Sequence, residues 1–328
     1  MKEFQRLRQF YYIPSTSPIA SCLVIAPKAT APFIRFCGDY VFLNKYIVIG
    51  HYPIPDVVRS LAKLATFVIY LDFDLVNAFH QILLGHITSA MLSIQTPWGQ
   101  FQPKFMPEGI APASFKLQST VADVFQDFEE WTILIFDNLL VLAHDYDDAY
   151  RKCEIILDRC IQRNVFLKFS KTWLGFPEVN FFGYVCTKNG YRLSDERKNA
   201  LNAVPFPKNV KQMQSFLGSA LFFKSFIPHF SSLTAPLNDM THKSFDWHSS
   251  SWKVDYPKVF DDLKQSLMKA TMLNFPDYNL LWILRTDASL FGVGAVLLQV
   301  KPAPNDPNAE PEYQPIAFSQ VRSLEWYS

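Results

Sequence analysis

Acidic residues interrupt the apolar runs in the first half of the chain. Phe67–Leu75 is rich in β-forming residues and predicts a buried strand, although Asp72 and Asp74 lie within it. Two further apolar runs predict the strands of a β-hairpin: Trp131–Leu134 and Leu139–Leu142. The residues between these runs, Ile-Phe-Asp-Asn, place Asp137 at the expected tip of the hairpin. The pattern therefore predicts carboxylates inside, or directly beside, buried strands.

Three other segments carry apolar residues at helical spacing and predict amphipathic helices. They are Ala149–Arg163, Val210–Phe226 and Phe260–Lys269. Acidic residues precede the first helix, where the helix dipole favours negative charge, and Asn209 is the expected N-cap of the second. Pro228 is expected to end that second helix.

The remaining patterned segments predict short strands. These are several strands between residues 17 and 60 broken by prolines, a single strand Val179–Val185, and the strands Leu280–Leu284 and Val293–Val300 around Asp287. Val76–Leu84 fits either a helix or a turn. Because strand-rich and helix-rich stretches alternate irregularly, the predicted fold class is α+β rather than a doubly wound parallel sheet.

The composition indicates a folded chain of about two domains. Of the 328 residues, 49% are hydrophobic and 19% are charged, which excludes a disordered or low-complexity protein. Lys plus Arg (31) nearly balance Asp plus Glu (30), giving a formal net charge of +1. The chain as a whole therefore has no electrostatic attraction to nucleic acid, and any such binding must use a local basic surface.

The expected location follows from sequence signals. No stretch resembles a membrane-spanning run of about 18 apolar residues, and the N-terminus lacks the apolar core of a signal peptide. The five cysteines form no Cys-x-x-Cys pair and fit a reducing compartment. We therefore expect an intracellular protein, in the cytoplasm or nucleus, with no membrane partner. Cys153 and Cys160 share helical spacing with Ala149 and favour a buried helix face over metal binding.

The acidic residues within apolar strands are the chemically informative feature. A carboxylate in such a place is costly to desolvate unless it is paired or binds a cation. Asp72 and Asp74 lie two apart and project from one face of a strand, and a site joining Asp74 to Asp137 would suit Mg²⁺ (or Mn²⁺). The alternatives are that Asp137 is an ordinary turn residue and that Asp72 is solvated at a sheet edge.

Seven blocks of the sequence resemble the reverse transcriptases of gypsy-type long-terminal-repeat retrotransposons. The catalytic-strand block is Asp74–Ile82 (DLVNAFHQI), and the block in the place of Tyr-x-Asp-Asp is Ile135–Asn138 (IFDN). The others are Arg35–Tyr40 with Leu43–Lys45, Met106–Gly109 with Pro112–Phe115, Phe181–Val185, Val210–Pro228, and Thr286–Ser289 with Gly292–Leu297. The last block resembles the opening strands of a ribonuclease H domain. The order matches across roughly residues 17–328.

The resemblance implies a right-hand polymerase (fingers, palm, thumb) followed by a truncated ribonuclease H-like α/β segment. It places fingers and palm at residues 1–195, thumb and connection at 196–275, and the ribonuclease H-like fragment at 276–328. The implied activity is RNA-directed DNA polymerisation by two-metal primer extension. The implied partners are an RNA or DNA template with a DNA primer, and deoxynucleoside triphosphates.

The same resemblance assigns site residues. Asp74 and Asp137 are the implied Mg²⁺ (or Mn²⁺) ligands, with Asn138 beside them and Lys171 near the leaving pyrophosphate. The residues implied to contact the nucleotide are Lys28, Arg35, Phe79 and Glu108, and those implied to grip the primer are Phe181, Phe182 and Gly183. Asp287 is the implied remnant of the ribonuclease H site.

Several departures from the family pattern bear on activity. Asn138 replaces the second Asp of its block and removes an ionic ligand, and Glu108 places a carboxylate where it would repel a triphosphate. Ile135 replaces a Tyr, Val41 replaces an Arg, and two residues are missing after Ile110. Asp287 alone cannot build a two-metal site, so ribonuclease H activity is not expected.

Three functions therefore stay open from the sequence. The first is a polymerase whose activity is impaired by Asn138 and Glu108, with Asp72 as a replacement for the missing charge. The second is a catalytically decayed retroelement remnant that binds primer–template nucleic acid. The third is an interaction domain that uses only the fold.

Overall fold

The structure is a computed structural model that describes most of the chain. The described residues are 2–27, 33–50, 52, 60–227, 229–249, 251–270, 272–289, 292–301 and 311–322. The backbone forms two compact units, one comprising Met1–Asp56 and Ile69–Phe176 and the other Val57–Val68 and Pro177–Ser328. Each unit mixes helices with mainly antiparallel sheets, so the prediction of an α+β fold is confirmed. The domain boundaries at residues 195 and 275 stay predictions.

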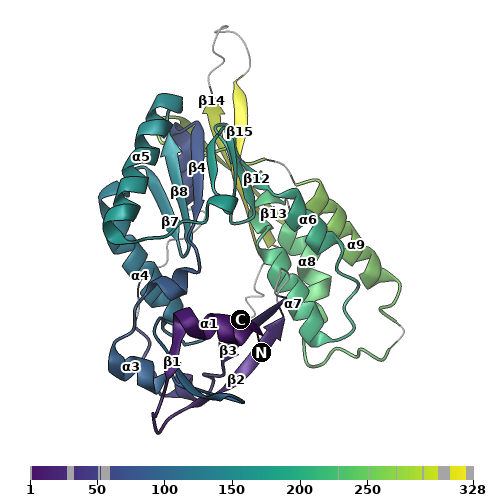
Figure 1. The fold of residues 1–328 in the computed structure, drawn as a ribbon. Coiled ribbons are helices and arrows are strands. Elements are labelled where there is room, and N and C mark those ends of the chain that lie inside the picture. Colours follow the sequence, from purple (N-terminus) through teal and green to yellow (C-terminus); the bar gives the residue numbers. More distant parts are fainter. Residues whose placement is uncertain are drawn as a thin grey trace. The chain divides into compact units, whose positions relative to one another are not determined.

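The first unit contains two sheets and several short helices (Figure 1). Its strands are β1 (Tyr12–Pro14), β2 (Ser21–Pro27), β3 (Ile34–Gly38), β4 (Ile69–Asp74), β5 (Ile94–Thr96), β6 (Gly99–Pro103), β7 (Thr132–Ile135), β8 (Asn138–Ala143) and β9 (Trp173–Phe176). Its helices are α1 (Lys2–Tyr11), α3 (His86–Met91), α4 (Ala113–Phe125) and α5 (Tyr146–Arg163), with 3-10 turns η1 (Leu43–Lys45), η3 (Ala78–Gln81), η4 (Gln126–Phe128) and η5 (Phe169–Lys171). The strand orders are β1-β6-β5-β2-β3 and β7-β8-β4-β9.

The four-stranded sheet forms the core of this unit. Strand β4 pairs with β8 on one side and β9 on the other, and Leu71 and Phe73 are almost fully buried. Helix α5 packs along β8 and β4, and α4 packs along β7 (Figure 1). The predicted buried strand and the predicted hairpin of β7 and β8 are therefore confirmed.

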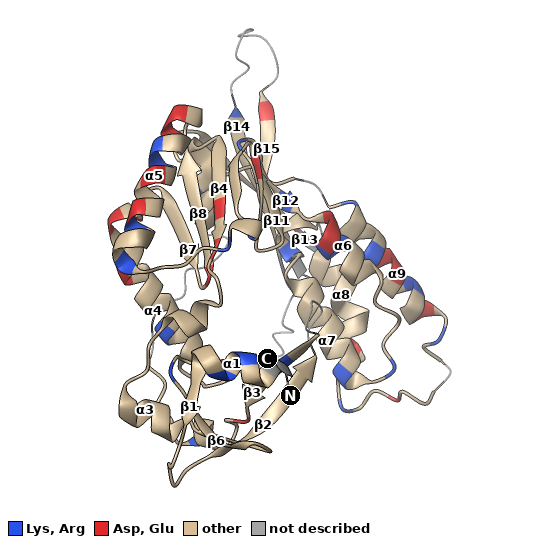
Figure 2. Cartoon of the chain, in the orientation of Figure 1, with Lys and Arg blue, Asp and Glu red and all other residues tan. Residues whose placement is uncertain are grey.

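Helix α5 begins where the acidic residues predict. Asp145 is its N-cap and accepts a hydrogen bond from the backbone N–H of Asp148 (2.7 Å). Asn164 ends the helix in the left-handed conformation, with φ of 52°. Figure 2 shows residues of both charge signs along α5, in keeping with the nearly balanced net charge. None of the described helices combines the length and apolar character that a membrane span requires.

Among its described residues, the second unit contains two three-stranded sheets and the helices α6 to α9 (Figure 1). Its strands are β10 (Glu178–Phe181), β11 (Tyr184–Thr187), β12 (Gly190–Leu193), β13 (Leu281–Ser289), β14 (Gly292–Lys301) and β15 (Glu312–Arg322). Its helices are α6 (Asp195–Asn202), α7 (Val210–Leu221), α8 (Phe230–Asp239) and α9 (Asp255–Met268), with 3-10 turns η2 (Ala62–Thr66) and η6 (Lys224–Phe226). The four helices pack against one another, and α8 and η6 contact β15.

The prediction of a single strand over Val179–Val185 is wrong. The segment forms the hairpin of β10 and β11, and its turn is Phe182–Gly183. Both turn residues have positive φ, 49° and 79°, which is the backbone that two-residue hairpin turns require. The Phe-Phe-Gly sequence is therefore a turn signal, because its glycine readily adopts positive φ.

Other boundaries differ by a few residues. Helix α7 has the predicted N-cap, since Asn209 accepts a hydrogen bond from the Gln212 N–H (2.9 Å), but it ends at Leu221 and tightens into η6. Helix α9 begins at Asp255 rather than at residue 260, because a proline is tolerated in a first helical turn. Asp287 lies within β13 rather than between two strands. The segment Val76–Leu84, which fits either a helix or a turn, contains the 3-10 turn η3.

We predict that Gly183→Ala lowers the free energy of unfolding by about 1–3 kcal/mol, because φ is positive there. A Cβ at this position would also lie 2.5 Å from Nη1 of Arg197. The matched control is Gly218→Ala within α7, where a Cβ meets nothing within 4 Å and should stabilise by about 0.5–1 kcal/mol. Urea unfolding followed by circular dichroism measures both changes, and equal effects would contradict the prediction.

Candidate active site

Backbone pairing brings the two predicted carboxylates to one end of the four-stranded sheet. In the ladder of β4 and β8, Asp74 lies opposite Asn138. Asp137 precedes Asn138 in the hairpin turn, and its carbonyl accepts a hydrogen bond from the N–H of Leu75 (2.9 Å). The structure therefore places Asp74, Asp137 and Asn138 next to one another along the backbone, although the first two are far apart in sequence.

A lysine neutralises part of this negative charge. Nζ of Lys171 lies 3.1 Å from Oδ2 of Asp74 and donates a hydrogen bond to it. The Asp74 side chain is 19% exposed, whereas the Lys171 side chain is 57% exposed. The lysine is therefore accessible to an anion arriving from solvent while it contacts the carboxylate.

Three hydrogen bonds hold the segment that precedes this lysine. The N–H of Lys168 donates to the carbonyl of Asp74 (2.7 Å). Gln81 then bridges the neighbouring loop, since its Nε2 donates to the Phe166 carbonyl and its Oε1 accepts from the Phe166 N–H, each at 2.9 Å. These bonds tie the segment before Lys171 to Asp74 and to Gln81 of η3.

Asp72 lies deeper in the same sheet. It pairs with Leu140 of β8 and Trp173 of β9, so the alternative of a carboxylate solvated at a sheet edge is wrong. Its Oδ1 is buried and has no hydrogen-bond partner among the described residues. Burial and then the charge of Asp74 raise the pKa of Asp72 to about 6, against a smaller opposing effect of Lys171. The surroundings of Asp72 therefore disfavour its ionised form, and this carboxylate lies beside the site.

The donor set fits a divalent cation that shares its coordination with a substrate. Proteins hold Mg²⁺ through one or two carboxylates, and waters and substrate phosphates complete its shell. Asp74 and Asp137 offer two carboxylates, and Asn138 offers an amide oxygen. Within the described part of the chain, no group of three or more Asp, Glu, His or Cys side chains is arranged to hold a metal. Two carboxylates and an amide oxygen are oxygen donors of the kind that Mg²⁺ binds together with waters and phosphates.

Two of the residues predicted to contact the nucleotide, Arg35 and Glu108, contact each other in the first unit. Nη1 of Arg35 on β3 lies 2.5 Å from Oε2 of Glu108, so each neutralises the other in this structure. Asn44 holds the Glu108 loop, because its Nδ2 donates to the Gly109 carbonyl (2.9 Å) and its Oδ1 accepts from the Ala111 N–H (2.8 Å). Glu108, which is expected to repel a triphosphate, therefore has a cationic partner in Arg35.

Two other predicted nucleotide contacts have different outcomes. Phe79 is half-buried in η3, directly after the strand that carries Asp74. Lys28 lies outside the described residues, so its assignment stays a prediction.

The predicted primer grip belongs to the second unit. Phe181 is fully buried at the end of β10, and Phe182 and Gly183 form the turn. Arg197 of α6 fixes this turn, because its Nη1 donates to the Phe182 carbonyl (2.8 Å). The same guanidinium lies 3.7 Å from the centre of the Phe222 ring, at the end of α7. One side chain thus joins the turn to that helix.

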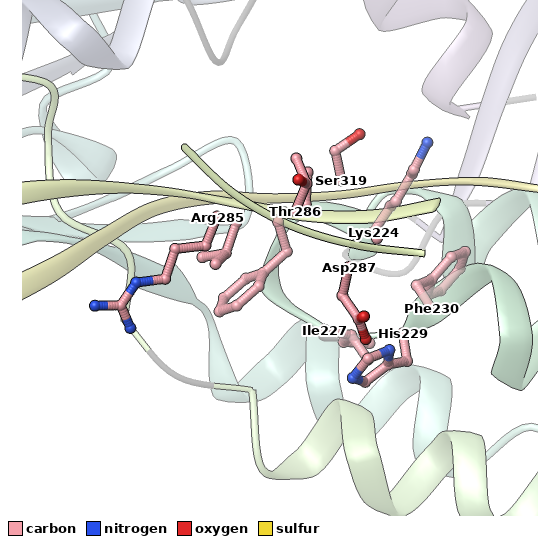
Figure 3. Close-up of a pocket in the computed structure, with 12 residues that line it drawn as sticks. Lys224, Ile227, His229, Phe230, Arg285, Thr286, Asp287 and Ser319 are labelled. Carbon is pink, nitrogen blue, oxygen red and sulfur yellow. The ribbon is translucent and has the colours of Figure 1, made fainter. Parts of the chain in front are cut away.

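Asp287 has different surroundings from the other predicted carboxylates. It lines a pocket of about 200 Å³ with Lys224, His229 and Arg285, and the pocket walls are mainly apolar (Figure 3). An imidazole and cationic side chains, rather than further carboxylates, therefore share this pocket with Asp287.

Four polar side chains that hold the site were missed by sequence reasoning. They are Asn44, Gln81, Gln118 and Arg197. Only Gln118 had a local signal, because it lies among the apolar positions of a helix and so required a buried partner. Asn44 and Gln81 lie in the 3-10 turns η1 and η3 and Arg197 lies on α6, and at such half-buried positions a polar residue is ordinary.

Two protein-family models match parts of the chain. Residues 29–186 match the family described as reverse transcriptase (RNA-dependent DNA polymerase). Residues 252–318 match the RNase H-like domain found in reverse transcriptase.

The Retrovirus-related Pol polyprotein from transposon opus of Drosophila melanogaster is 27% identical over 299 residues, which cover 87% of this chain and 30% of the relative. The Transposon Tf2-7 polyprotein of Schizosaccharomyces pombe is 28% identical over 288 residues, covering 88% and 21%. The chain thus spans less than a third of these curated relatives.

Solved structures show the same fold. The foamy viral protease-reverse transcriptase dRH in complex with double-stranded DNA has a TM-score of 0.85 and 18% sequence identity, covering 97% of this chain and 54% of that chain. The foamy viral protease-reverse transcriptase in complex with an RNA/DNA hybrid has a TM-score of 0.80 and 18% identity, covering 99% and 43%. The predicted polymerase fold with a ribonuclease H-like segment is confirmed.

We predict that Asp72→Asn stabilises the protein at neutral pH. The raised pKa means that the folded state holds a proton which the unfolded state releases above about pH 4. Raising the pH from 4 through 6 therefore destabilises the wild type, by up to about 3 kcal/mol for a shift of this size. The variant should gain about 1–3 kcal/mol at pH 7.5 and nothing near pH 4.

Urea unfolding at the two pH values measures this gain. Asp123→Asn, an exposed change on α4, is the control and should show no gain at either pH. A variant no more stable than the wild type at pH 7.5 would contradict the assignment of Asp72 as a partly buried carboxylate with a raised pKa.

Proposed function

Because the chain carries a reverse transcriptase domain and an RNase H-like domain of the kind found in retrotransposon polyproteins, we propose that it is a template-directed DNA polymerase of the gypsy type. We propose further that two of its own side chains, Asn138 and Glu108, reduce its activity. The carrying observation is the pairing of β4 with β8, which sets Asp74 opposite Asn138 beside Asp137. This is an arrangement that two-metal nucleotidyl transfer can use.

In this proposal Asp74 and Asp137 hold Mg²⁺ or Mn²⁺ together with the amide oxygen of Asn138. The bound ion would make the primer hydroxyl more acidic and neutralise charge on the leaving phosphates. Lys171 supports the role given to it, since its contact with Asp74 leaves it largely exposed for an anionic leaving group. Phe79, in the turn after Asp74, packs against the sugar of the nucleotide.

The remaining contacts bind substrates. Lys28 and Arg35 hold the triphosphate, Arg35 through the paired N–H groups that suit phosphate oxygens. Phe181, Phe182 and Gly183 hold the end of a DNA primer on an RNA or DNA template. The deoxynucleoside triphosphate must compete with Glu108 for Arg35, because these two side chains pair in the substrate-free chain.

A second candidate function is a remnant that binds primer–template duplex without catalysis. Two observations favour it: Asn138 carries no charge at the metal site, and Arg35 is occupied by Glu108. Both functions share the fold and the duplex, so only the chemical step separates them.

The test is primer extension by the purified chain on RNA and DNA templates with Mg²⁺ or Mn²⁺. We expect slow extension that Asn138→Asp accelerates at least about tenfold, because an ionic metal ligand is restored. Asp137→Asn is the control and should abolish extension. Absent extension by both the wild type and Asn138→Asp would overturn the polymerase proposal.

Binding to an RNA/DNA hybrid then distinguishes the alternatives. Anisotropy measured from 50 to about 200 mM salt should show affinity that falls steeply, as phosphate contacts require. Steep binding without extension supports the remnant, and no binding supports an interaction domain.

We also predict that Glu108→Gln tightens nucleotide binding. The change frees Arg35 and removes a carboxylate, and an exposed ion pair contributes about 0.2–1 kcal/mol, so the apparent Kd for the nucleotide should fall about two- to fivefold. Glu129→Gln, an exposed change away from β3, is the control. Single-turnover extension over a range of nucleotide concentrations measures the Kd, and an unchanged or higher value contradicts a role of Glu108 as competitor.

A further inference from the structure

A polar side chain occupies a core position of α4. Gln118 is 2% exposed and lies among the buried residues Leu117 and Val121 of that helix. A buried amide without hydrogen bonds is strongly destabilising, so a glutamine here needs specific partners.

Both ends of the Gln118 amide have such partners. Its Nε2 donates to the carbonyl of Leu134 (3.1 Å), and its Oε1 accepts from the N–H of Phe136 (2.6 Å). Leu134 lies in β7 and Phe136 lies in the hairpin turn, so both backbone groups come directly before Asp137. The donor end and the acceptor end are therefore both specified, and no apolar side chain of the same size could replace them.

The backbone that Gln118 holds is an unfavourable one. Phe136 has φ of 55°, a left-handed conformation that costs a non-glycine residue about 1–2 kcal/mol. Asp137 follows directly, and its own carbonyl is held by the N–H of Leu75 (2.9 Å). The metal-binding carboxylate of the proposed function thus lies between two fixed points, one set by β4 and the other by Gln118.

We propose that Gln118 is the positioning residue of this site: it selects the left-handed conformation of Phe136 and thereby sets where Asp137 stands relative to Asp74. It acts through the backbone of the turn and does not touch the substrate. The inference rests on the proposed function for its consequence, but its structural half can be tested without catalysis.

Gln118→Met keeps the size of the side chain and removes both hydrogen bonds. The matched control is Thr120→Val on the same helix, because Oγ1 of Thr120 is buried without a hydrogen-bond partner among the described residues. Amide hydrogen exchange of residues 132–140 reads the turn directly. We expect exchange at Phe136 to accelerate at least about tenfold in Gln118→Met and to stay unchanged in Thr120→Val.

Titration with Mn²⁺ alone, followed by electron paramagnetic resonance, reads the metal site. We expect Gln118→Met to weaken Mn²⁺ binding about 10- to 100-fold, as loss of residues that orient metal ligands typically does. In extension assays the rate at saturating nucleotide should fall, while the apparent nucleotide Kd stays within about twofold, because Gln118 bonds to the Leu134–Phe136 backbone rather than to Arg35.

Repeating the measurement in a Phe136→Gly protein separates an effect on the position of Asp137 from an effect on core packing. Phe136→Gly adopts a positive φ without a steric penalty, so Gln118→Met should weaken Mn²⁺ binding by less than about threefold when combined with it. This background also serves if Gln118→Met alone fails to fold.

The outcomes are distinct. Unchanged exchange at Phe136 in folded Gln118→Met overturns the proposal, whatever the metal result. Faster exchange, with Mn²⁺ binding that neither Gln118→Met nor Asp137→Asn alters, keeps Gln118 as the clamp of the turn but removes the metal site, and so overturns the proposed function instead.

Discussion

The pairing of β4 with β8 is the constraint on which the candidate site depends. The register is continuous from Ile69 opposite Ala143 to Asp74 opposite Asn138, and the residues on its inner positions are almost fully buried. A slip of one residue would turn every side chain to the other face, so the apolar pattern of both strands fixes the register strongly. Core packing therefore fixes which residues of β4 and β8 lie opposite one another, and so brings Asp74 opposite Asn138.

Charge pairing within the first unit gives the site a definite resting state. Lys171 contacts Asp74 and Arg35 contacts Glu108, so two cations that would meet a nucleotide each already have an internal carboxylate partner. An anionic substrate therefore exchanges partners with these side chains rather than meeting free charges. Exposed pairs of this kind are weak, which keeps such an exchange feasible. The two pairs differ in the proposed function, because Lys171 contacts a proposed metal ligand, Asp74, whereas Arg35 contacts Glu108, which has no proposed role in metal binding.

Much of the fold could be predicted because its signals are local. The apolar run ending at Asp74, the hairpin around Asp137 and the caps Asp145 and Asn209 were each visible in a few adjacent residues. The turn at Phe182–Gly183 was missed, since a glycine between aromatics can be either a strand residue or a turn and only the positive φ decides. Pairings such as Arg35 with Glu108, 73 residues away, and the loop contacts of Asn44 depend on tertiary structure and leave no pattern along the chain. The roles of the site residues came from resemblance, since spacing alone could not separate Asp137 from an ordinary turn residue.

The contacts of Arg197 couple the movements of the elements that it joins. One guanidinium bonds to the Phe182 carbonyl and lies on the ring of Phe222, while the N–H of Ser194 donates to the Gly183 carbonyl (3.0 Å). These contacts join three elements at one place: the tip of the β10–β11 hairpin, the start of α6 and the end of α7. A displacement of α7 would therefore also displace the hairpin tip, because both contact the same guanidinium. A duplex that contacted both elements would then meet them as one unit.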